Sequence, residues 1–466
     1  MDKTCLFKKE ISCCLNCNII KTRDDVYPVC LKHTDDGTFS LCEHHPGCSW
    51  CDSSTSLDNK VLRERIEPWL TSLFQSEHLS LLVGSGLTTG ICEIAKQKST
   101  GMTQAVFTHF GKEIEEEVTN SAHRLNRADG NFEDSIRIAN ELLAGLTILR
   151  DKNAEKLQEE IDDNLLKFAT SLLQTEEKLA LSPESNEAFN CLIAFLMSFA
   201  SRTGTRDRLN IFTTNYDRLI EEAADLAGMH LLDRFVGKMS PVFRASRLNL
   251  DLHYNPPGIR GEPRYLEGVA HFTKLHGSLD WVQAGTLIRK IGLPFGAKDV
   301  APYLQAPGLD GATAFNLMIY PNSMKDRETA EYPYVELFRD FAAAVCRQNS
   351  TVVTYGYSFG DEHINRMLRD MLTIPSTHLV IISYNDPLGR IPAFYHAGHT
   401  NQISLLIGPN VADIQTLTQQ FLPKSSIDFA TSRMGELLKA RLATKSEKGE
   451  ESSFAADKET PLEEKK

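Results

Sequence analysis

The most informative segment of this chain is Ile211-Phe212-Thr213-Thr214-Asn215-Tyr216-Asp217-Arg218-Leu219-Ile220. Leu209, Ile211 and Phe212 are typical of a buried strand, and the apolar residues that follow recur at helical spacing. Gly228 is placed to end that helix in a left-handed cap. The stretch therefore predicts a buried strand that runs directly into a helix.

Polar side chains gather where this strand passes into the helix. The junction carries Thr214, Asn215 and Asp217. In open α/β sheets ligands bind at the carboxyl ends of strands, and these groups suit the holding of a sugar hydroxyl or the orientation of a water. Thr and Asn before a helix also serve as N-caps, so a purely structural role is the alternative.

The composition indicates a soluble protein of two or three folded units. The chain has 466 residues, of which 41% are hydrophobic and 24% are charged, with a net charge of -12. This acidic balance disfavours broad attraction to nucleic acid or to an anionic membrane. The most apolar run, residues 188–200, is too short to span a membrane, and the amino terminus does not resemble a secretion signal.

Most of the eleven cysteines lie between Cys5 and Cys51. In a chain with no export signal, such clustering favours metal-bound thiolates in a reducing cytoplasm over disulfides. Candidate ligands come in pairs of identical spacing: Cys14 with Cys17, Cys30 with His33, Cys42 with His45, and Cys48 with Cys51.

Each pair is expected to supply two ligands from one tight turn. Zinc takes four nitrogen or sulfur ligands, so the pairs suffice for two closed sites, separate or cross-braced. A single site from Cys14, Cys17, Cys48 and Cys51 is the smaller alternative. Reduced structural cysteines are a third reading, but a segment so poor in large apolar residues needs metal to fold. We expect residues 1–58 to be a structural zinc-binding module that contacts protein, and the sequence leaves contact with nucleic acid open.

The remainder predicts an α/β domain over residues 59–442, with a Rossmann-like, mostly parallel sheet. Residues 95–200 are predicted to form a helical insert, and residues 443–466 a disordered charged tail. Besides Leu209–Phe212, strands are expected at Leu81–Val83, Phe315–Tyr320, Thr351–Tyr355, Leu379–Tyr384 and Ile403–Ile407. The first of these ends at a glycine-rich turn, Gly84–Gly90, whose backbone N–H groups are suited to a phosphate.

The turn at Gly84, the Asn-x-Asp junction, His276, the turn Gly356-Tyr357-Ser358 and Asn385 follow one another along the chain. This series resembles the sirtuin-like family, and more closely the prokaryotic sirtuin-like NAD hydrolases of anti-phage defence than the protein deacylases. The resemblance covers roughly Leu79 to Pro409, without the helical insert.

The resemblance implies a role for each matching residue. Gly84, Ser85, Gly86 and Thr88 would form the pyrophosphate turn. Asn215 and Asp217, together with Thr214, would hold the nicotinamide ribose, and His276 would be the catalytic histidine. Gly356 and Ser358 would lie along the phosphates and adenosine, and Asn385 would meet the adenine ribose.

Two departures separate the chain from the deacylases. Cys92-Glu93-Ile94 stands where their Pro-Asp-Phe-Arg run is expected, and only Cys346 lies between His276 and Gly356, where they carry a four-cysteine zinc module. The resemblance therefore implies an NAD glycohydrolase that releases nicotinamide and depletes NAD in anti-phage defence. A protein deacylase and a non-catalytic nucleotide-binding scaffold are the alternatives. The resemblance further implies a homo-oligomer with a separately encoded ATPase or another defence partner.

The implied reaction cleaves the bond between nicotinamide and ribose and leaves an oxocarbenium-like ribose, by analogy with glycoside chemistry. In this hypothesis Asp217 supplies negative charge or ribose hydrogen bonds, and Asn215 orients the water. His276 acts as a base on a ribose hydroxyl or on the water, a role for which an imidazole is suited near neutral pH.

Overall fold

A computed structural model gives the structure of this chain. It describes residues 17–22, 25–42, 50–51, 56–124, 130–202, 206–246, 251–254, 264–266, 268–309, 311–312, 316–319 and 332–424. Met1–Leu422 form one unit and Pro423–Lys466 another. The predicted tail at 443–466, and the predicted domain end at 442, lie outside the described residues.

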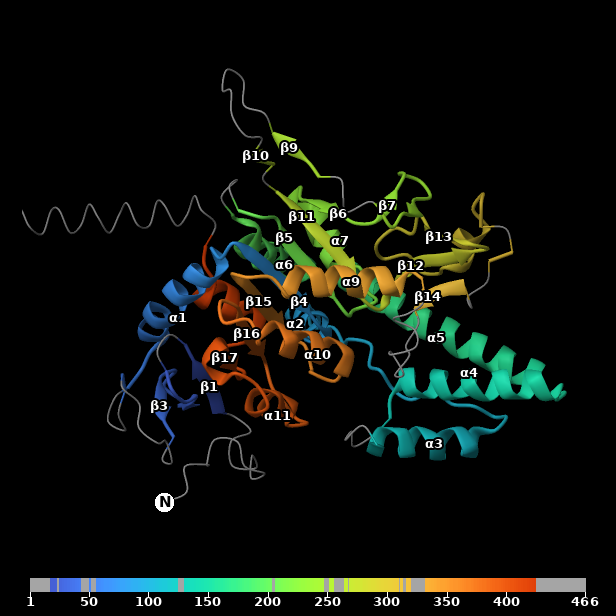
Figure 1. Cartoon of the computed structure of the whole chain (residues 1–466), viewed down its shortest axis with the longest axis horizontal. Coiled ribbons are helices and arrows are strands. Elements are labelled where there is room, and N and C mark those ends of the chain that lie inside the picture. The colour runs from blue at the N-terminus through green and yellow to red at the C-terminus, as the bar shows by residue number, and fades with distance from the viewer. Residues whose placement is uncertain are drawn as a thin grey trace, which may run out of the picture. The chain divides into compact units, whose positions relative to one another are not determined.

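The described strands of the main sheet follow the order β3-β2-β1-β17-β16-β15-β4-β5-β11-β6 (Figure 1). Neighbours from β17 to β6 run parallel. The bounds of these parallel strands are β4 His78–Val83, β5 Leu209–Thr213, β6 His230–Leu232, β11 Val269–Lys274, β15 Ser350–Tyr355, β16 His378–Ser383 and β17 Ile403–Ile407. The arrangement confirms the predicted Rossmann-like, mostly parallel sheet.

The opening stretch of the sequence forms the strand and helix that it predicts. Strand β5 ends at Thr213, and helix α7 (Leu219–Ala227) begins after a short loop that contains Asn215 and Asp217. Gly228 ends α7 with a φ of 70°, and its N–H reaches the carbonyls of Ala224 and Asp225. A left-handed cap of this kind favours glycine, because a side chain is strained there.

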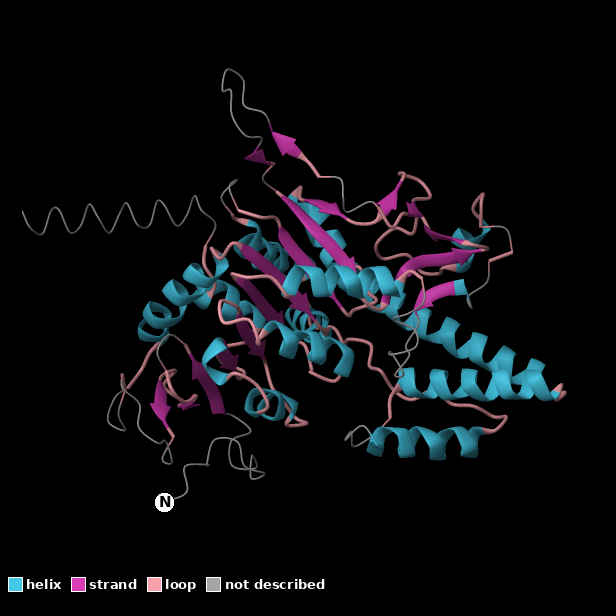
Figure 2. Cartoon of the chain, viewed as in Figure 1, coloured by secondary structure: helices cyan, strands magenta, loops and turns pink. Residues whose placement is uncertain are grey.

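Helices cover both faces of the sheet (Figure 2). One face carries α1 Asn59–Phe74, α2 Ser85–Ile94, α6 Ser185–Ala200, α7, α12 Ile414–Thr416 and the π-helix η6 Leu417–Phe421. The other carries α9 Tyr334–Val345, α10 Glu362–Met371 and α11 Arg390–His396. Successive strand residues point to opposite faces, so Ile211 joins the first layer and Phe212 the second.

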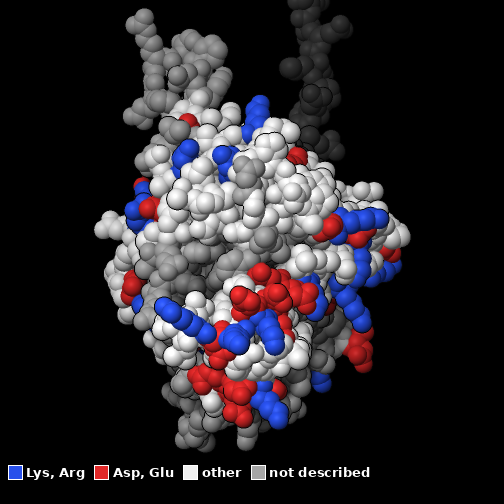
Figure 3. All heavy atoms as spheres, turned by 90° about the vertical axis from the view of Figure 1, so that its right-hand side faces the viewer, with Lys and Arg blue, Asp and Glu red and all other residues white. Residues whose placement is uncertain are grey.

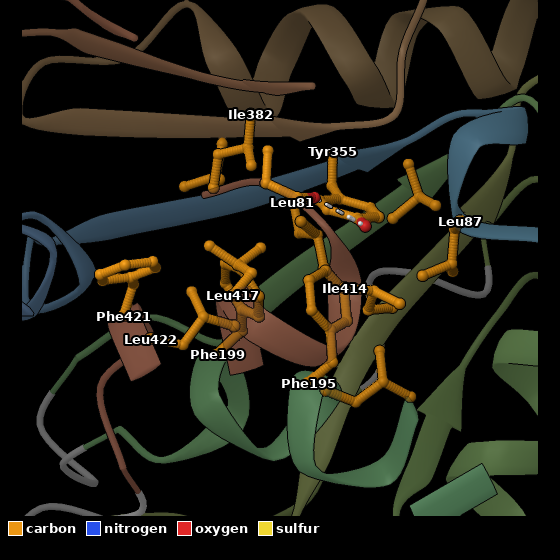
Figure 4. Close-up of a cluster of buried hydrophobic side chains, with 14 of the residues drawn as sticks. Leu81, Leu87, Phe195, Phe199, Tyr355, Ile382, Ile414, Leu417, Phe421 and Leu422 are labelled. Atoms are coloured by element: carbon orange, nitrogen blue, oxygen red, sulfur yellow. Dashed lines mark hydrogen bonds between the residues drawn. The ribbon is translucent and has the colours of Figure 1, made fainter. Parts of the chain in front are cut away.

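The first of these layers is a closely packed apolar core (Figure 4). The ring of Tyr355 on β15 lies 5.0 Å from the ring of Phe195 on α6, measured between centroids. The Tyr355 hydroxyl donates to the carbonyl of Ala412 at 3.3 Å, so its polar atom is satisfied inside the core. Burial raises the pKa of Tyr355 well above its ordinary value, and the phenol stays protonated.

A second, smaller sheet is connected to β11 through the strand that follows it, β12. Its described order is β14-β12-β13-β8-β7, with bounds β7 Phe235–Val236, β8 Val242–Phe243, β12 Gly277–Ala284, β13 Leu287–Lys290 and β14 Leu317–Ile319. The described part of the strand predicted at Phe315–Tyr320 is β14, and it therefore belongs to this sheet and not to the main one. The structure also has a short ribbon of β9 His253–Tyr254 and β10 Arg264–Tyr265, and the 3-10 helices η3 Ala301–Gln305 and η5 Thr400–Gln402.

The region predicted to be a helical insert, residues 95–200, is largely helical, although its last helix packs on the main sheet. It contains α3 Gly111–Arg124, α4 Phe132–Leu149 and α5 Ala154–Leu181, and α6 follows on the main sheet. A capping box between Asn131 and Asp134 starts α4. The apolar sides of α3, α4 and α5 pack together and against residues of β12 and β14. The face of the molecule at this end shows acidic and basic side chains intermixed (Figure 3).

The cysteine-rich segment extends the main sheet. Strands β1 Cys17–Lys21, β2 Val29–His33 and β3 Phe39–Leu41 are antiparallel to one another, and β1 pairs with β17. Helix α1 begins next, with the Asp58 side chain as its N-cap. Of the described helices, none is both long and apolar enough to cross a membrane.

Candidate active site

The candidate site lies at the carboxyl ends of four neighbouring strands, β15, β4, β5 and β11. Tyr355 is paired with Val83, Val83 with Thr213, and Thr213 with Lys274, so the four strands end level with one another. Loops that leave adjacent strand ends meet at one edge of a parallel sheet. This register brings together the segments predicted to carry the chemistry.

Two of these loops touch through glycines. A Cβ added to Gly84 would lie 2.5 Å from the carbonyl oxygen of Gly356, and a Cβ added to Gly86 would lie 2.5 Å from the Gly356 Cα. Gly356 itself has a φ of +59°. Glycine is required at these positions because two backbones pass where no side chain fits.

The predicted turn at Gly84–Gly90 is corrected by the structure. Gly84 is an N-cap, and Ser85 already begins helix α2. The Gly86 N–H donates to the Gly356 carbonyl at 3.0 Å. This N–H is therefore not available to bind a phosphate. Ser85 is exposed at the amino end of α2, an end that carries the partial positive charge suited to an anion.

Asn215 is held in one orientation. Its Nδ2 donates to the Gly84 carbonyl at 3.0 Å and to Thr88 Oγ1 at 3.1 Å, and its backbone N–H donates to Thr213 Oγ1. The side chain is buried. Because the amide nitrogen makes both side-chain bonds and, among the described residues, no donor reaches Oδ1, the amide oxygen is the atom that remains to orient a water.

Asp217 is connected to Asn215 through Thr88. The Thr88 hydroxyl donates to Asp217 Oδ2 at 2.6 Å while it accepts from Asn215. The other carboxylate oxygen accepts from the N–H of Leu219, the first residue of α7, at 3.3 Å. Thr88, predicted to bind the pyrophosphate, therefore orients the Asn-x-Asp pair in this structure. Asp217 also acts on Cys92, because burial, with a further contribution from this carboxylate, raises the pKa of that thiol to about 12.

Lys274 is a site residue that the sequence analysis missed. It ends β11, is buried, and its Nζ donates to the backbone carbonyls of Asp217 and Tyr216, the latter at 3.4 Å. It also forms an ion pair with Glu221 at 3.0 Å. Burial raises the pKa of Glu221, and the ammonium of Lys274 opposes that rise. A lysine at the end of an otherwise buried strand was the available signal.

His276 stands at the junction of the two sheets. It follows β11, and Gly277 turns the chain into β12 with a φ of 90°. His276 Nε2 lies 2.9 Å from Asp361 Oδ2, and both side chains are at least nine-tenths buried. When Asp361 is ionised, Nε2 of His276 carries the proton that lies between them.

The sequence analysis assigned no role to Asp361. Its second oxygen accepts from the His363 N–H at 3.0 Å, so Asp361 is also the N-cap of α10. Its backbone carbonyl accepts from the Tyr357 hydroxyl. An aspartate directly before a helix was the signal, but it indicates a cap and not a partner for a histidine 85 positions earlier.

The remaining predicted ligand-binding residues line the same edge. Thr214 follows β5 and is half-buried, with its N–H bonded to the Val83 carbonyl. Ser358 follows β15 and Asn385 follows β16, and both are exposed. These side chains are therefore half-buried or exposed just after the strands that precede them, and their binding of a ligand stays a prediction.

Strand pairing groups three of the predicted metal ligands. In antiparallel register Cys17 opposes Lys32 and Ile19 opposes Cys30, so Cys17 and Cys30 share a face. The Cys42 N–H bonds to the Cys30 carbonyl, and the three sulfur atoms lie within 4.8 Å of one another. Hydrogen bonding, chiefly to Cys30, lowers the pKa of Cys42 to about 6. Three thiols, one poised to ionise, fit a thiophilic metal.

His33 does not join this group. Residues three apart in a strand point to opposite faces, so Cys30 and His33 are not paired ligands from one turn, and that prediction is wrong. The His33 ring packs edge-on against Phe39 at 4.9 Å between centroids. Cys51 is buried but is not one of the three grouped thiols. Cys14, His45 and Cys48 lie outside the described residues.

Two cavities lie away from the candidate site. One, of about 510 Å³, is lined by residues 104–108 and 110–115, Val118 and Ser135 of the helical insert. The other, of about 520 Å³, lies at the amino ends of β4, β15 and β16. Polar residues, among them Glu77, Arg206 and His378, line much of the second cavity, but none of the predicted site residues lines either cavity.

Comparison with known proteins agrees with this geometry for part of the chain. Residues 209–400 match the family model described as the SIR2-like domain. The matched region includes Asn215, Asp217, His276 and Asp361. No curated protein matches the chain. The match supports a sirtuin-like domain over residues 209–400 and, with it, an NAD-related function for this protein.

Proposed function

We propose that this protein is an NAD glycohydrolase, which cleaves the nicotinamide–ribose bond to give nicotinamide and ADP-ribose. The observation that carries the proposal is the pairing of a fixed amide and carboxylate, Asn215 and Asp217, with a buried His276–Asp361 pair on neighbouring strand ends. The SIR2-like match over this region supports NAD as the substrate.

The proposed roles follow from the chemistry and the position of each side chain. Asn215 orients the attacking water through its amide oxygen. Asp217 places negative charge beside the ribose, where positive charge develops as the neutral nicotinamide leaves. His276 accepts a proton from the water or from a ribose hydroxyl, with Asp361 holding its ring.

The chain offers less support for peptide deacylation. Between His276 and Gly356 the sequence has only Cys346, and part of this segment forms the second sheet through β12, β13 and β14. A zinc module that shapes an acyl-peptide groove needs four ligands in that segment. We therefore propose water, and not an acylated lysine, as the partner of NAD in the reaction.

We further propose that NAD depletion is used in anti-phage defence, by a homo-oligomer that works with a separately encoded ATPase or another defence protein. The support is the likeness of the site motifs to NAD hydrolases of that kind. An enzyme that destroys NAD has to be held inactive until it is needed, and the helical insert and the cysteine-rich strands are candidates for that control.

For the grouped thiols we propose structural zinc. Cys17, Cys30 and Cys42 would hold it, with a fourth ligand still to be identified. Metal analysis of the purified protein checks this: the Cys30→Ser variant is expected to lose the bound zinc and to melt at a lower temperature. Equal zinc content in the variant and the parent would contradict the assignment.

The test of the main proposal is incubation of the purified chain with NAD, with and without an acetylated peptide, and separation of the products. Nicotinamide plus ADP-ribose without peptide supports the proposal, and the Asn215→Ala variant is expected to give neither product. Turnover only with peptide would make the protein a deacylase. No turnover under any condition would leave a nucleotide-binding scaffold.

A further inference from the structure

The Asn-x-Asp loop faces two sides of the molecule in alternation. Asn215 and Asp217 point to α2, where both bond to Thr88. Tyr216 and Arg218, the residues between and after them, point to the helical insert instead. The proposed catalytic pair is therefore placed by contacts on its reverse side as well as by Thr88.

Arg218 is bound to the insert through one carboxylate. The Arg218 N–H donates to Glu176 Oε1 at 2.9 Å, Nε donates to the same oxygen at 3.3 Å, and Nη2 donates to Oε2 at 2.5 Å. The Glu176 side chain on α5 is fully buried, and that of Arg218 is 7% exposed. The guanidinium also donates to the carbonyls of Leu293 and Pro294 after β13. Charge-assisted bonds of this kind in a buried setting restrict the loop strongly.

Tyr216 makes a second attachment to the insert. Its hydroxyl donates to Glu133 Oε1 on α4 at 3.1 Å. Its ring meets that of Phe168 on α5 edge-on at 6.0 Å, and Phe168 stacks on Phe132 of α4 at 4.4 Å. Helices α4 and α5 thus contact both residues that alternate with the catalytic pair.

We propose that Glu176 is a positioning residue: through Arg218 it holds Asn215 and Asp217 where they act, so that the helical insert sets the rate of NAD cleavage. This inference rests on the proposed function. It assigns the insert a part in the reaction. In the hydrogen bonds described above, no side chain of the insert bonds to Thr88, Asn215 or Asp217.

The expected effect is on turnover more than on binding. A displacement of about 1 Å in a catalytic group lowers a rate by about 100-fold, whereas contacts to the rest of the substrate are unaffected. Glu176→Gln keeps the shape and one acceptor for the Arg218 N–H but loses the charge opposite the guanidinium. It should therefore loosen the loop without removing any group that touches NAD.

Steady-state NAD cleavage by the full chain tests the proposal. Per folded molecule, Glu176→Gln is expected to lower kcat by about 10- to 100-fold and to change KM by less than about 3-fold. The matched control is Glu177→Gln, the adjacent residue, whose half-buried carboxylate forms an ion pair with the exposed Lys298 at 3.6 Å. It should retain the parent kcat. A kcat for Glu176→Gln within about 2-fold of the control would overturn the proposal.

A double variant guards against loss of folding, because Glu176→Gln leaves Arg218 buried without its charge partner. Glu176→Gln combined with Arg218→Met has no such charge, and its melting temperature should recover while kcat stays low. Recovery of kcat together with stability would show that Glu176 only stabilises the fold, and it would overturn the positioning role.

Amide hydrogen exchange separates this inference from the proposed function. If the parent protein does not cleave NAD, the proposed function fails, but the attachment of the loop is still measurable. Exchange in a peptide spanning 214–219 is expected to be at least about 10-fold faster in Glu176→Gln, with a β16 peptide at 378–383 unchanged. Equal exchange at 214–219 in both proteins would show that Glu176 does not hold the loop.

Discussion

The two edges of the main sheet both hold buried polar groups, but they use them differently. At the carboxyl edge, the proposed catalytic side chains bond to other side chains: Asn215 and Asp217 to Thr88, and His276 to Asp361. At the amino edge, the buried cation of Arg202 bonds to main-chain carbonyls instead. A side-chain partner fixes the direction of a reactive group, whereas a set of carbonyl partners ties segments of chain together.

Arg202 illustrates the amino edge. Its guanidinium donates to the carbonyls of Phe74, Ser76, Glu77 and Asp207, which join the end of α1 and the starts of β4 and β5. Burial lowers the pKa of Arg202 to about 10. All three guanidinium nitrogens of Arg202 therefore donate to main-chain carbonyls. We therefore expect changes at the amino edge to alter stability, and changes at the carboxyl edge to alter turnover.

The largest expected effect is at His276. His276→Ala should lower kcat for NAD cleavage by about 100- to 10,000-fold, because it removes the proposed base. Its melting temperature should move by no more than about 4 °C. The contrasting variant is Arg202→Met, which should lower the free energy of unfolding by about 3 kcal/mol, since it leaves buried carbonyls without donors, while kcat per folded molecule is retained. Similar losses of turnover in both variants would remove the distinction between the edges.

The next largest expected effect is a loss of stability at acid pH, caused by a histidine at the amino edge of the main sheet. Burial lowers the pKa of His378, at the start of β16, to about 4. The unfolded chain then binds more protons than the folded chain between pH 6.5 and pH 4. The contribution of His378 to the free energy of unfolding is therefore fully present above pH 6.5 and is lost as the pH drops toward 4. The loss from this group should be about 3 kcal/mol.

Denaturant unfolding at a series of pH values measures this loss. The His378→Gln variant, which has no titrating ring, should show a smaller change between pH 6.5 and pH 4. If the variant and the parent lose the same stability over that range, His378 is not the group responsible.

A smaller effect is expected where the two glycine loops touch. Gly86→Ala should destabilise the protein by about 1–3 kcal/mol, because the new Cβ would lie 2.5 Å from the Gly356 Cα and backbone must shift. Gly145→Ala on α4 is the matched change, with nothing within 4 Å of its Cβ, and it should stabilise by about 0.5–1 kcal/mol. Thermal or denaturant unfolding of both variants would reveal this opposite sign, and equal signs would mean that the loops are not in contact.

The smallest expected effect is at Asp361. Asp361→Asn should lower kcat by about 10-fold, because a neutral amide no longer selects the ring nitrogen that carries the proton. Asparagine is as good an N-cap as aspartate, so α10 and the melting temperature should be preserved. Glu362→Gln, at the exposed neighbour, is the control for loss of a carboxylate in this turn. Unchanged turnover in Asp361→Asn would reduce Asp361 to a helix cap.

Local sequence patterns accounted for most of the scaffold. The strand Leu209–Thr213, the helix that follows it and its glycine cap at Gly228 were all readable, because they depend on neighbours within a few residues. The convergence of Gly84, Asn215 and Gly356 on one edge also followed from the sequence, since parallel strands present their carboxyl ends on the same side.

Local patterns were less informative where the same pattern is compatible with two kinds of local structure. The glycines at 84–90 predicted a turn, but they start helix α2, because Gly84 and Gly86 are needed for contact with Gly356 and not for a loop. Cys30 and His33 have the spacing of paired zinc ligands, yet they lie in a strand. The spacing alone does not distinguish a turn from a strand, and only in a turn do both side chains face one metal.

Residue patterns along the chain thus predict the layered α/β fold, the edge where polar residues collect and the identity of the candidate amide, carboxylate and imidazole. The partners of these groups are visible only in the folded chain: Thr88 for Asn215 and Asp217, Asp361 for His276, and Glu176 for Arg218. These partners lie 42 to 129 positions apart along the chain. Contacts over such separations depend on which strands and helices become neighbours, and no local periodicity encodes that choice.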